Sequence, residues 1–151
     1  MSGLTLLMTE TEQGLQQIKQ QQLPTLTQTT DWQNKYRMLM QLGKGVPAFA
    51  AELQREEFLI TGCDSKAWLL HEYHQPSGRH YWAFDSEARI IKGLVLLALC
   101  QLNGLTNVEL SQINFSQLFA LSGVQQNLSP SRQNGLHAVL KKLSQQAGLA
   151  H

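Results

Sequence analysis

The sequence has few of the features that bind a protein to a nucleic acid or a membrane. Only 15% of its 151 residues are charged, and 12 basic side chains against 11 acidic ones give a net charge of +1. This balance excludes a field of positive charge for a nucleic acid backbone or an anionic lipid surface. The longest apolar run, Gly93–Cys100, is too short to cross a bilayer. We therefore expect a globular protein with neither a nucleic acid nor a membrane as its partner.

Cysteine is scarce as well, since only Cys63 and Cys100 are present. Two cysteines do not make the disulfide framework of a small exported domain. The first residues, Met1–Gln13, lack the basic leader and long apolar core of a secretory signal. We expect a cytoplasmic protein with free thiols. Zinc and Fe–S clusters need several thiolates or imidazoles at suitable spacing, so we expect no metal site.

The length suits one domain with a sizeable core. Residues 1–30 are rich in glutamine, and Leu15, Ile18 and Leu23 have the spacing of a short amphipathic helix. A partly disordered segment is the alternative for this stretch. We divide the chain into a weakly ordered or short-helix lead-in, residues 1–30, and one domain, residues 31–151.

A firmer helix is expected to begin at Thr30, which fits a capping box with Gln33. Trp32, Tyr36, Leu39 and Met40 are expected on one apolar, buried face of this helix, and Gly43 is expected to cap its C-terminus.

The middle of the chain has the pattern of a β-hairpin. Lys66–His74 and Arg79–Phe84 are rich in aromatic and aliphatic residues, and Gln75–Gly78 between them fits a type I turn. The remaining chain is mostly helical. Its expected helices begin near Ser86, at a capping box of Thr106 and Glu109, and at Ser129 followed by Pro130. The sequence therefore predicts an α+β fold in which a small antiparallel β-sheet packs against helices.

The hairpin register predicts where Cys63 lies. With the turn at Gln75–Gly78, Trp68 lies opposite Asp85 and Lys66 opposite Glu87, which brings the Cys63 loop to the start of the long helix. The positive end of that helix favours a thiolate, whereas the negative charges of Asp64 and Asp85 disfavour it. The sign of the net change in the Cys63 pKa stays open.

The two cysteines have different surroundings in the sequence. Gly62 gives the backbone before Cys63 the freedom of a tight turn, so this thiol is placed to react. Cys100 lies inside an apolar helix, and there we expect a structural role, since buried cysteine behaves as a small hydrophobe.

Four segments in this order resemble the signature segments of the SufE/CsdE sulfur-acceptor family, with the CsdE branch the nearer match. They are Asp31–Pro47, Gly62–Leu69, Asp85–Leu94 and Leu128–Val139. The likeness extends from about Asp31 to Lys142. It departs from the family pattern at Val46 and Ala67, where leucine and valine are common, and both changes are conservative.

The resemblance implies a fold and a function. Members are small α+β proteins that share a core with Fe–S scaffold proteins of the IscU kind. They bind a cysteine desulfurase of the SufS or CsdA type, which uses pyridoxal phosphate and carries a persulfide on its own cysteine. The acceptor's cysteine takes that sulfur as a persulfide and passes it to an Fe–S scaffold or another acceptor. Such a protein is a persulfide carrier that stimulates the desulfurase, and is not itself an enzyme or a holder of a cofactor.

Cys63 occupies the position of the family's persulfide acceptor. The residues we expect to shape its loop or contact the partner are Gly62, Asp64, Ser65, Asp85 and Arg132. Arg132 lies in the first turn of the last helix, where a cation opposes the helix dipole. The resemblance suggests that it contacts the partner or the Cys63 loop.

Two other functions stay open from the residues alone. Cys63 could be the nucleophile of a hydrolase if one of His71, His74, His80 or His137 served as its base. However, His71 and His74 fall on opposite faces of a strand, and no segment suggests an oxyanion hole. The other possibility is a non-catalytic interaction module, which would tolerate the loss of Cys63.

Overall fold

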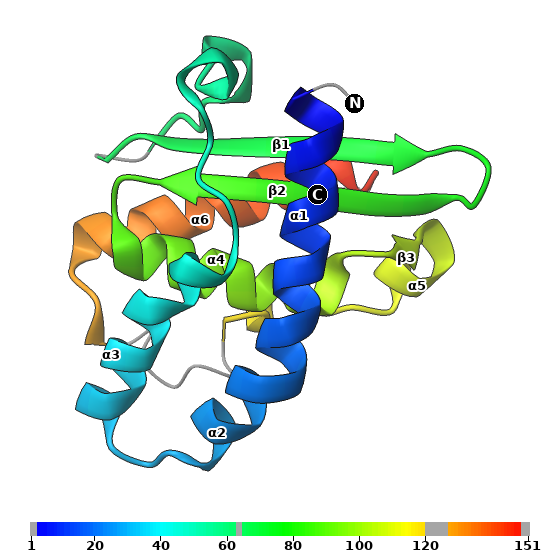
Figure 1. Cartoon of the computed structure of the whole chain (residues 1–151). Helices are drawn as coiled ribbons and strands as arrows, with labels where there is room; N and C mark the ends of the chain where they lie inside the picture. The colour runs from blue at the N-terminus through cyan, green and yellow to red at the C-terminus, as the bar shows by residue number, and fades with distance from the viewer. Residues whose placement is uncertain (1–2, 63–64, 120–126, 149–151) are drawn as a thin grey trace.

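The computed structural model describes residues 3–62, 65–119 and 127–148, which form helices around a small antiparallel sheet (Figure 1). The sheet has three strands in the order β1-β2-β3, with bounds Ala67–His74, Arg79–Ser86 and Leu105–Thr106. The helices are α1 (Gly3–Gln17), α2 (Leu23–Gln28), α3 (Trp32–Leu42), α4 (Arg89–Leu102), α5 (Asn107–Ser111) and α6 (Pro130–Gln146). A π-helical segment, Ile18–Gln22, joins α1 to α2. Short 3₁₀ turns lie at Gly43–Gly45, Ala51–Leu53, Glu56–Phe58 and Phe115–Gln117. The expected α+β fold is confirmed.

Strands β1 and β2 form the expected hairpin in the expected register. His74 pairs with Arg79, and Trp68 pairs with Asp85 at the other end. Gly78 adopts a φ of 68°, and its N–H donates to the His74 carbonyl at 2.8 Å. The left-handed backbone at this position explains why glycine ends the turn.

Helices cover both faces of the sheet. Figure 1 shows α1 crossing in front of the strands and α6 passing behind them. On the α1 face, one cluster of buried residues contains Leu7, Met8, Phe49, Leu53, Trp68, Leu70 and Ala83. The opposite face of the hairpin packs on α4 and α6. Because successive side chains of a strand alternate between faces, neighbouring residues such as Trp68 and Leu69 enter different clusters.

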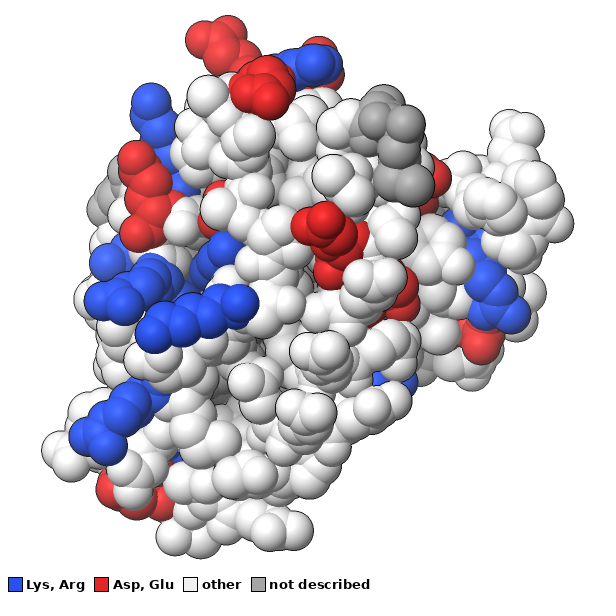
Figure 2. Space-filling view, viewed as in Figure 1, with Lys and Arg blue, Asp and Glu red and all other residues white. Residues whose placement is uncertain are grey.

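Charges of both signs lie on the face that Figure 2 shows. Lys and Arg gather at its left side, with Asp and Glu among them, while a wide uncharged area covers the lower middle, where Figure 1 places α1 and α2. In the described part of the chain, no helix is long and apolar enough to cross a membrane.

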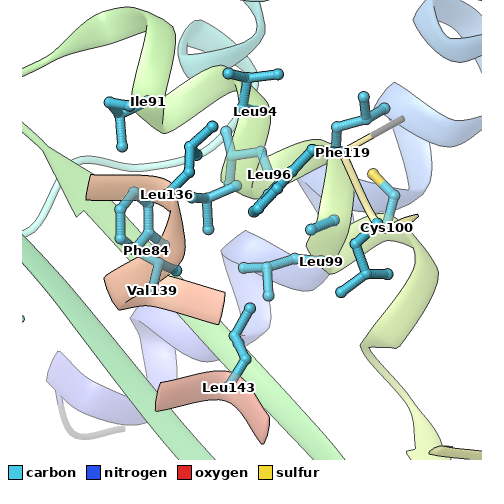
Figure 3. Packing of buried hydrophobic residues seen from close by; sticks show 14 of the residues in the cluster. Phe84, Ile91, Leu94, Leu96, Leu99, Cys100, Phe119, Leu136, Val139 and Leu143 are labelled. Atoms are coloured by element: carbon cyan, nitrogen blue, oxygen red, sulfur yellow. The ribbon is translucent and has the colours of Figure 1, made fainter. Parts of the chain in front are cut away.

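The main core forms around α4, which is buried on every side from Ile90 to Cys100. Figure 3 shows its leucines meeting Phe84 from β2 and Leu136, Val139 and Leu143 from α6. A fully buried Leu or Phe side chain contributes about 1.5–3 kcal/mol through the loss of its contact with water. The packing of α4 and α6 therefore fixes the position of the first turn of α6, which borders the Cys63 loop.

The glutamine-rich N-terminal segment is helical from Gly3 and docks on the rest of the protein. Leu15, Ile18 and Leu26 are almost completely buried in the main core. Of the two possibilities for this segment, the structure has the docked helix. The hydrogen bond that the Cys100 thiol donates to the Leu15 carbonyl, 3.6 Å between Sγ and O, lies at this contact.

Of the three expectations for α3, the C-cap at Gly43 is confirmed in its position, while the N-cap and the place of Trp32 on the buried face are wrong. Asp31, and not Thr30, is the N-cap, and its side chain accepts from the Gln33 N–H at 3.1 Å. Trp32 lies 48% exposed, because the face of α3 that packs on α4 centres on Leu39 and Leu42. Gly43 keeps a right-handed φ of −59°, and a Cβ there would lie 2.9 Å from the Lys92 side chain. Close passage of Lys92, and not a left-handed cap, explains this glycine.

Candidate functional site

The site is the loop between the Leu59–Ile60 segment and β1. Cys63 and Asp64 lie outside the described residues, so the site is built from the residues on either side of them. Leu59 forms an isolated antiparallel bridge with Trp68, and the Ile60 N–H donates to the Ala67 carbonyl at 2.9 Å. These contacts bring the chain before the loop and the chain after it side by side at the end of the sheet.

Gly62 holds the first half of the loop against α6. Its φ of 96° is left-handed, and a Cβ built on it would lie 3.3 Å from the Cβ of Ala138. A side chain here would be strained by both the backbone conformation and the neighbouring helix. The sequence reasoning predicted a turn at this glycine, and the contact with Ala138 adds a packing reason for it.

Ser65 holds the second half of the loop against the same helix. Arg132 donates from Nη1 to Ser65 Oγ at 3.2 Å. Arg132 is itself positioned by the start of α6, because its backbone N–H donates to the Oγ of Ser129 at 3.2 Å, and Pro130 occupies the first turn. The helix start expected at Ser129 is confirmed. Cys63 therefore lies, in sequence, between two residues that both contact α6.

A third contact holds the loop to the segment between β2 and α4. The Lys66 N–H donates to Glu87 Oε1 at 2.9 Å, and the Glu87 N–H donates to the Lys66 carbonyl at 3.0 Å. The predicted pairing of Lys66 with Glu87 is thus confirmed. The Glu87 side chain was missed as a site residue, although the register alone was enough to bring it to the loop.

Asp85 does not mark the start of α4, which begins at Arg89 with Ala88 as an uncapped N-cap. It lies within β2 and is buried, with 8% of its surface exposed. Its Oδ2 accepts from the Phe49 N–H at 2.8 Å, and its Oδ1 lies 3.1 Å from Lys92 Nζ. The carboxylate thus ties the segment around Phe49 to β2 and α4, and among the described residues it forms no hydrogen bond or ion pair with the Cys63 loop.

The hairpin histidines bond to one another and to their neighbours. His71 Nε2 lies 2.8 Å from His80 Nδ1, and His80 Nε2 lies 2.6 Å from Asn107 Oδ1. Because the amide oxygen of Asn107 only accepts, His80 donates to it from Nε2 and accepts from His71 at Nδ1. Burial, with a smaller effect of His80, lowers the pKa of His71 from 6.5 to about 4.

This arrangement gives no support to a cysteine hydrolase. His71 lies about 13 Å along β1 from Ala67, the strand residue next to the loop, at about 3.3 Å per residue. His74 bonds to Ser77 at the hairpin turn, at 2.7 Å between Nδ1 and Oγ. His137 is exposed on α6. Within residues 3–62, 65–119 and 127–148, no three His, Cys, Asp or Glu side chains lie close enough to hold a metal ion.

Cys100 is in the core, as expected. Figure 3 shows its sulfur beside Phe119, and only 7% of its surface is exposed. Burial raises the pKa of the Cys100 thiol to about 12. Since the thiolate is the nucleophile, this cysteine is unreactive near neutral pH. Of the two cysteines, Cys100 is therefore the one whose surroundings disfavour thiol chemistry.

Comparison with known proteins identifies relatives over most of the chain. The family model SufE, described as an Fe–S metabolism associated domain, matches residues 20–147. The sulfur acceptor protein CsdE of Escherichia coli is 36% identical over 115 residues, which cover 76% of this chain and 78% of that protein. An uncharacterized SufE-like protein of Haemophilus influenzae is 32% identical over 120 residues, covering 78% of this chain and 93% of its own length.

A third relative, an uncharacterized SufE-like protein of Rhizobium etli, is 32% identical over 119 residues, or 78% of this chain and 80% of that protein. The matched region of the family model includes the hairpin, α4, the Cys63 loop and the first turn of α6, which together build the site.

Proposed function

Because this chain belongs to the SufE family, we propose that it is a sulfur acceptor whose Cys63 takes sulfane sulfur from a cysteine desulfurase. The observation that best supports this proposal is the contrast between the two thiols. Cys100 is buried with a raised pKa, whereas the residues on either side of Cys63 form a short loop at the end of the sheet. The E. coli relative CsdE is named a sulfur acceptor protein, which agrees with this role.

The proposed reaction is a thiol exchange at sulfur. The Cys63 thiolate attacks the terminal sulfur of the persulfide on the desulfurase cysteine, and a new S–S bond forms as the old one breaks. The desulfurase cysteine leaves as a thiolate, and Cys63 now carries the persulfide. One sulfur atom moves, and the proton lost by the Cys63 thiol balances the one that the leaving thiolate takes up. No net oxidation occurs, so no further redox partner is needed.

The contacts of the loop support this role. Both sides of the Cys63 position are held to rigid elements of the fold. Gly62 lies against Ala138, Ser65 accepts a hydrogen bond from Arg132, and Lys66 donates one to Glu87. Sites held by helices and strands position a reacting atom more accurately than free loops do. Arg132 and Lys66 bring positive charge to the loop, which favours a thiolate, whereas the Glu87 carboxylate at the Lys66 N–H and Asp64 oppose it.

The partner in this proposal is a pyridoxal-phosphate cysteine desulfurase of the SufS or CsdA type. The persulfide then passes to an Fe–S scaffold or to another sulfur acceptor in the cytoplasm. This chain acts as a carrier that stimulates the desulfurase and holds no cofactor of its own. A purified sample with a pyridoxal absorbance band, or with stoichiometric zinc or iron, would contradict the last point.

The test is a sulfide-release assay with the purified cysteine desulfurases encoded in the same genome. Sulfide production from cysteine in the presence of a reductant is measured with and without this protein. The expected result is stimulation of one desulfurase that saturates as the protein is added. Equal rates with and without the protein for every desulfurase would overturn the proposal.

A further inference from the structure

A pocket of about 330 Å³ lies beside the Cys63 loop, between the chain leading into it and the second half of α6. Its lining residues are Leu59, Ile60, Thr61, Ala138, Lys141, Lys142 and Gln145. Thr61 precedes Gly62, and Ala138 is the residue that a Cβ built on Gly62 would meet at 3.3 Å. The pocket and the Cys63 loop therefore share a wall.

The pocket is positively charged. Lys141 and Lys142 lie three and four residues beyond Ala138, so they continue the face of α6 that borders the loop. The lining contains no carboxylate, and neither lysine belongs to an ion pair among the described residues. The sequence from residue 110 to residue 151 contains no aspartate or glutamate. Within the part of the chain that the structure describes, no carboxylate therefore neutralises the two ammonium groups.

The occupant must be held by more than these two charges. Both lysines are exposed, and exposed ion pairs contribute only about 0–1 kcal/mol each. A free anion would accordingly bind weakly here. An acidic segment of a protein that has already docked on the neighbouring loop is presented at a high effective concentration, so the same weak contacts become useful. Leu59, which is partly exposed, supplies an apolar surface for the aliphatic parts of such a segment.

We propose that this pocket receives an acidic segment of the sulfur-donating desulfurase, with carboxylates that pair with Lys141 and Lys142. This inference rests on the proposed function, because it assumes that the desulfurase docks at the Cys63 loop. The contact guides association and adds to the affinity of the docked complex, and it takes no part in the transfer of sulfur itself. Charges at the edge of an interface act mainly on the association rate and on its dependence on salt.

The test compares the full-length protein with two double variants of equal charge change. The first variant, Lys141→Glu with Lys142→Glu, reverses the charge of the pocket. Lys19→Glu with Arg37→Glu reverses two exposed cations on the α2–α3 side of the molecule and serves as the matched control. Dissociation constants for the desulfurase identified by sulfide release are measured by calorimetry at low and high salt. We expect the pocket variant to bind at least about tenfold more weakly at low salt, with a smaller salt dependence than wild type.

The control variant is expected to keep a dissociation constant within about threefold of wild type, since distant exposed charges are largely screened by salt. At saturating concentration, the pocket variant is expected to accept sulfur at the wild-type rate. Unchanged affinity in the pocket variant, or an equal loss in the control, would overturn the docking site and leave the acceptor function intact. A wild-type protein that neither binds nor stimulates any desulfurase would overturn both.

Discussion

Arg132 and Ser65 form the one side-chain hydrogen bond, among the described residues, between α6 and the Cys63 loop. Arg132 was expected from the sequence to contact either this loop or a partner, and the structure places it 3.2 Å from the Ser65 hydroxyl. Its position in the first turn of α6 is electrostatically unfavourable for the helix. Arg132 therefore stabilises the Cys63 loop more than it stabilises α6.

Replacing Ser65 with alanine is expected to loosen the loop without changing its charge. A hydrogen bond to a charged group contributes about 1.5–3 kcal/mol, and its partial exposure reduces this figure. We expect Cys63 to be alkylated about three to ten times faster in Ser65→Ala, with little change in the melting temperature. Rates with iodoacetamide, followed by mass spectrometry, measure the effect.

A double-mutant cycle separates the contact from other effects of the two side chains. If the hydrogen bond restrains the loop, Ser65→Ala with Arg132→Ala reacts no faster than the faster single variant. Additive effects, or rates equal to wild type in Ser65→Ala, would show that this contact does not restrain the loop.

Asp85 and Lys92 make a buried ion pair whose loss is expected to be costly. Their side chains are only 11% and 10% exposed, and Asp85 also accepts from the Phe49 N–H. Removing one member leaves a buried charge without a partner, which destabilises a protein by about 3–5 kcal/mol. We expect this loss in Asp85→Asn from urea unfolding. The exposed pair of Arg55 and Glu57 is the control, because Glu57→Gln should cost less than about 1 kcal/mol. Similar losses in the two variants would contradict this account.

At the scale of the helices and strands, local sequence patterns were sufficient to predict the hairpin and the first residues of two helices. The turn at Gln75–Gly78 sets every pair along β1 and β2, because the register of a hairpin follows from its turn. The capping box of Thr106 and Glu109 and the cap at Ser129 are present as expected. Each of these features depends on residues a few positions apart, and so is visible in the sequence.

The sequence patterns did not predict features that depend on residues far apart in the chain. The sequence before α4 looks like a helix cap at Asp85, but the Phe49 N–H that binds its carboxylate is 36 residues away. The exposure of Trp32 and the close passage of Lys92 over Gly43 likewise depend on how α3 packs on α4. Periodicity gives the apolar face of a helix but does not give its partner.

His71 links the stability of the hairpin to pH. Its pKa is lowered from 6.5 to about 4 by burial and by His80, so the unfolded chain binds this proton more readily than the folded one. The resulting stabilisation is fully present above pH 6.5 and is lost as the pH falls towards 4. We expect His71→Gln to lose less stability than wild type between pH 7 and pH 5, measured by urea unfolding. An equal loss in both proteins would show that His71 has no such role.

At the scale of the whole molecule, three elements converge on the Cys63 loop. The start of β1, the segment before α4 and the first turns of α6 each contribute a contact, from Ala67, Glu87 and Arg132. Gly62 and the hairpin register predicted the loop, and the resemblance to a known family predicted the contact of Arg132 with it, because the resemblance compares separated segments at once. The pocket at Lys141 and Lys142 was not foreseen, since only the fold brings α6 to Leu59–Thr61.

Intact-mass spectrometry after incubation with the desulfurase and cysteine tests the central claim most directly. The protein is expected to gain one sulfur atom, about 32 Da, in wild type and in Cys100→Ser, and to gain none in Cys63→Ser. A reducing agent should remove the added mass, because a persulfide is reducible. Sulfur found on Cys100, or an undiminished gain in Cys63→Ser, would contradict the assignment of Cys63 as the sulfur acceptor.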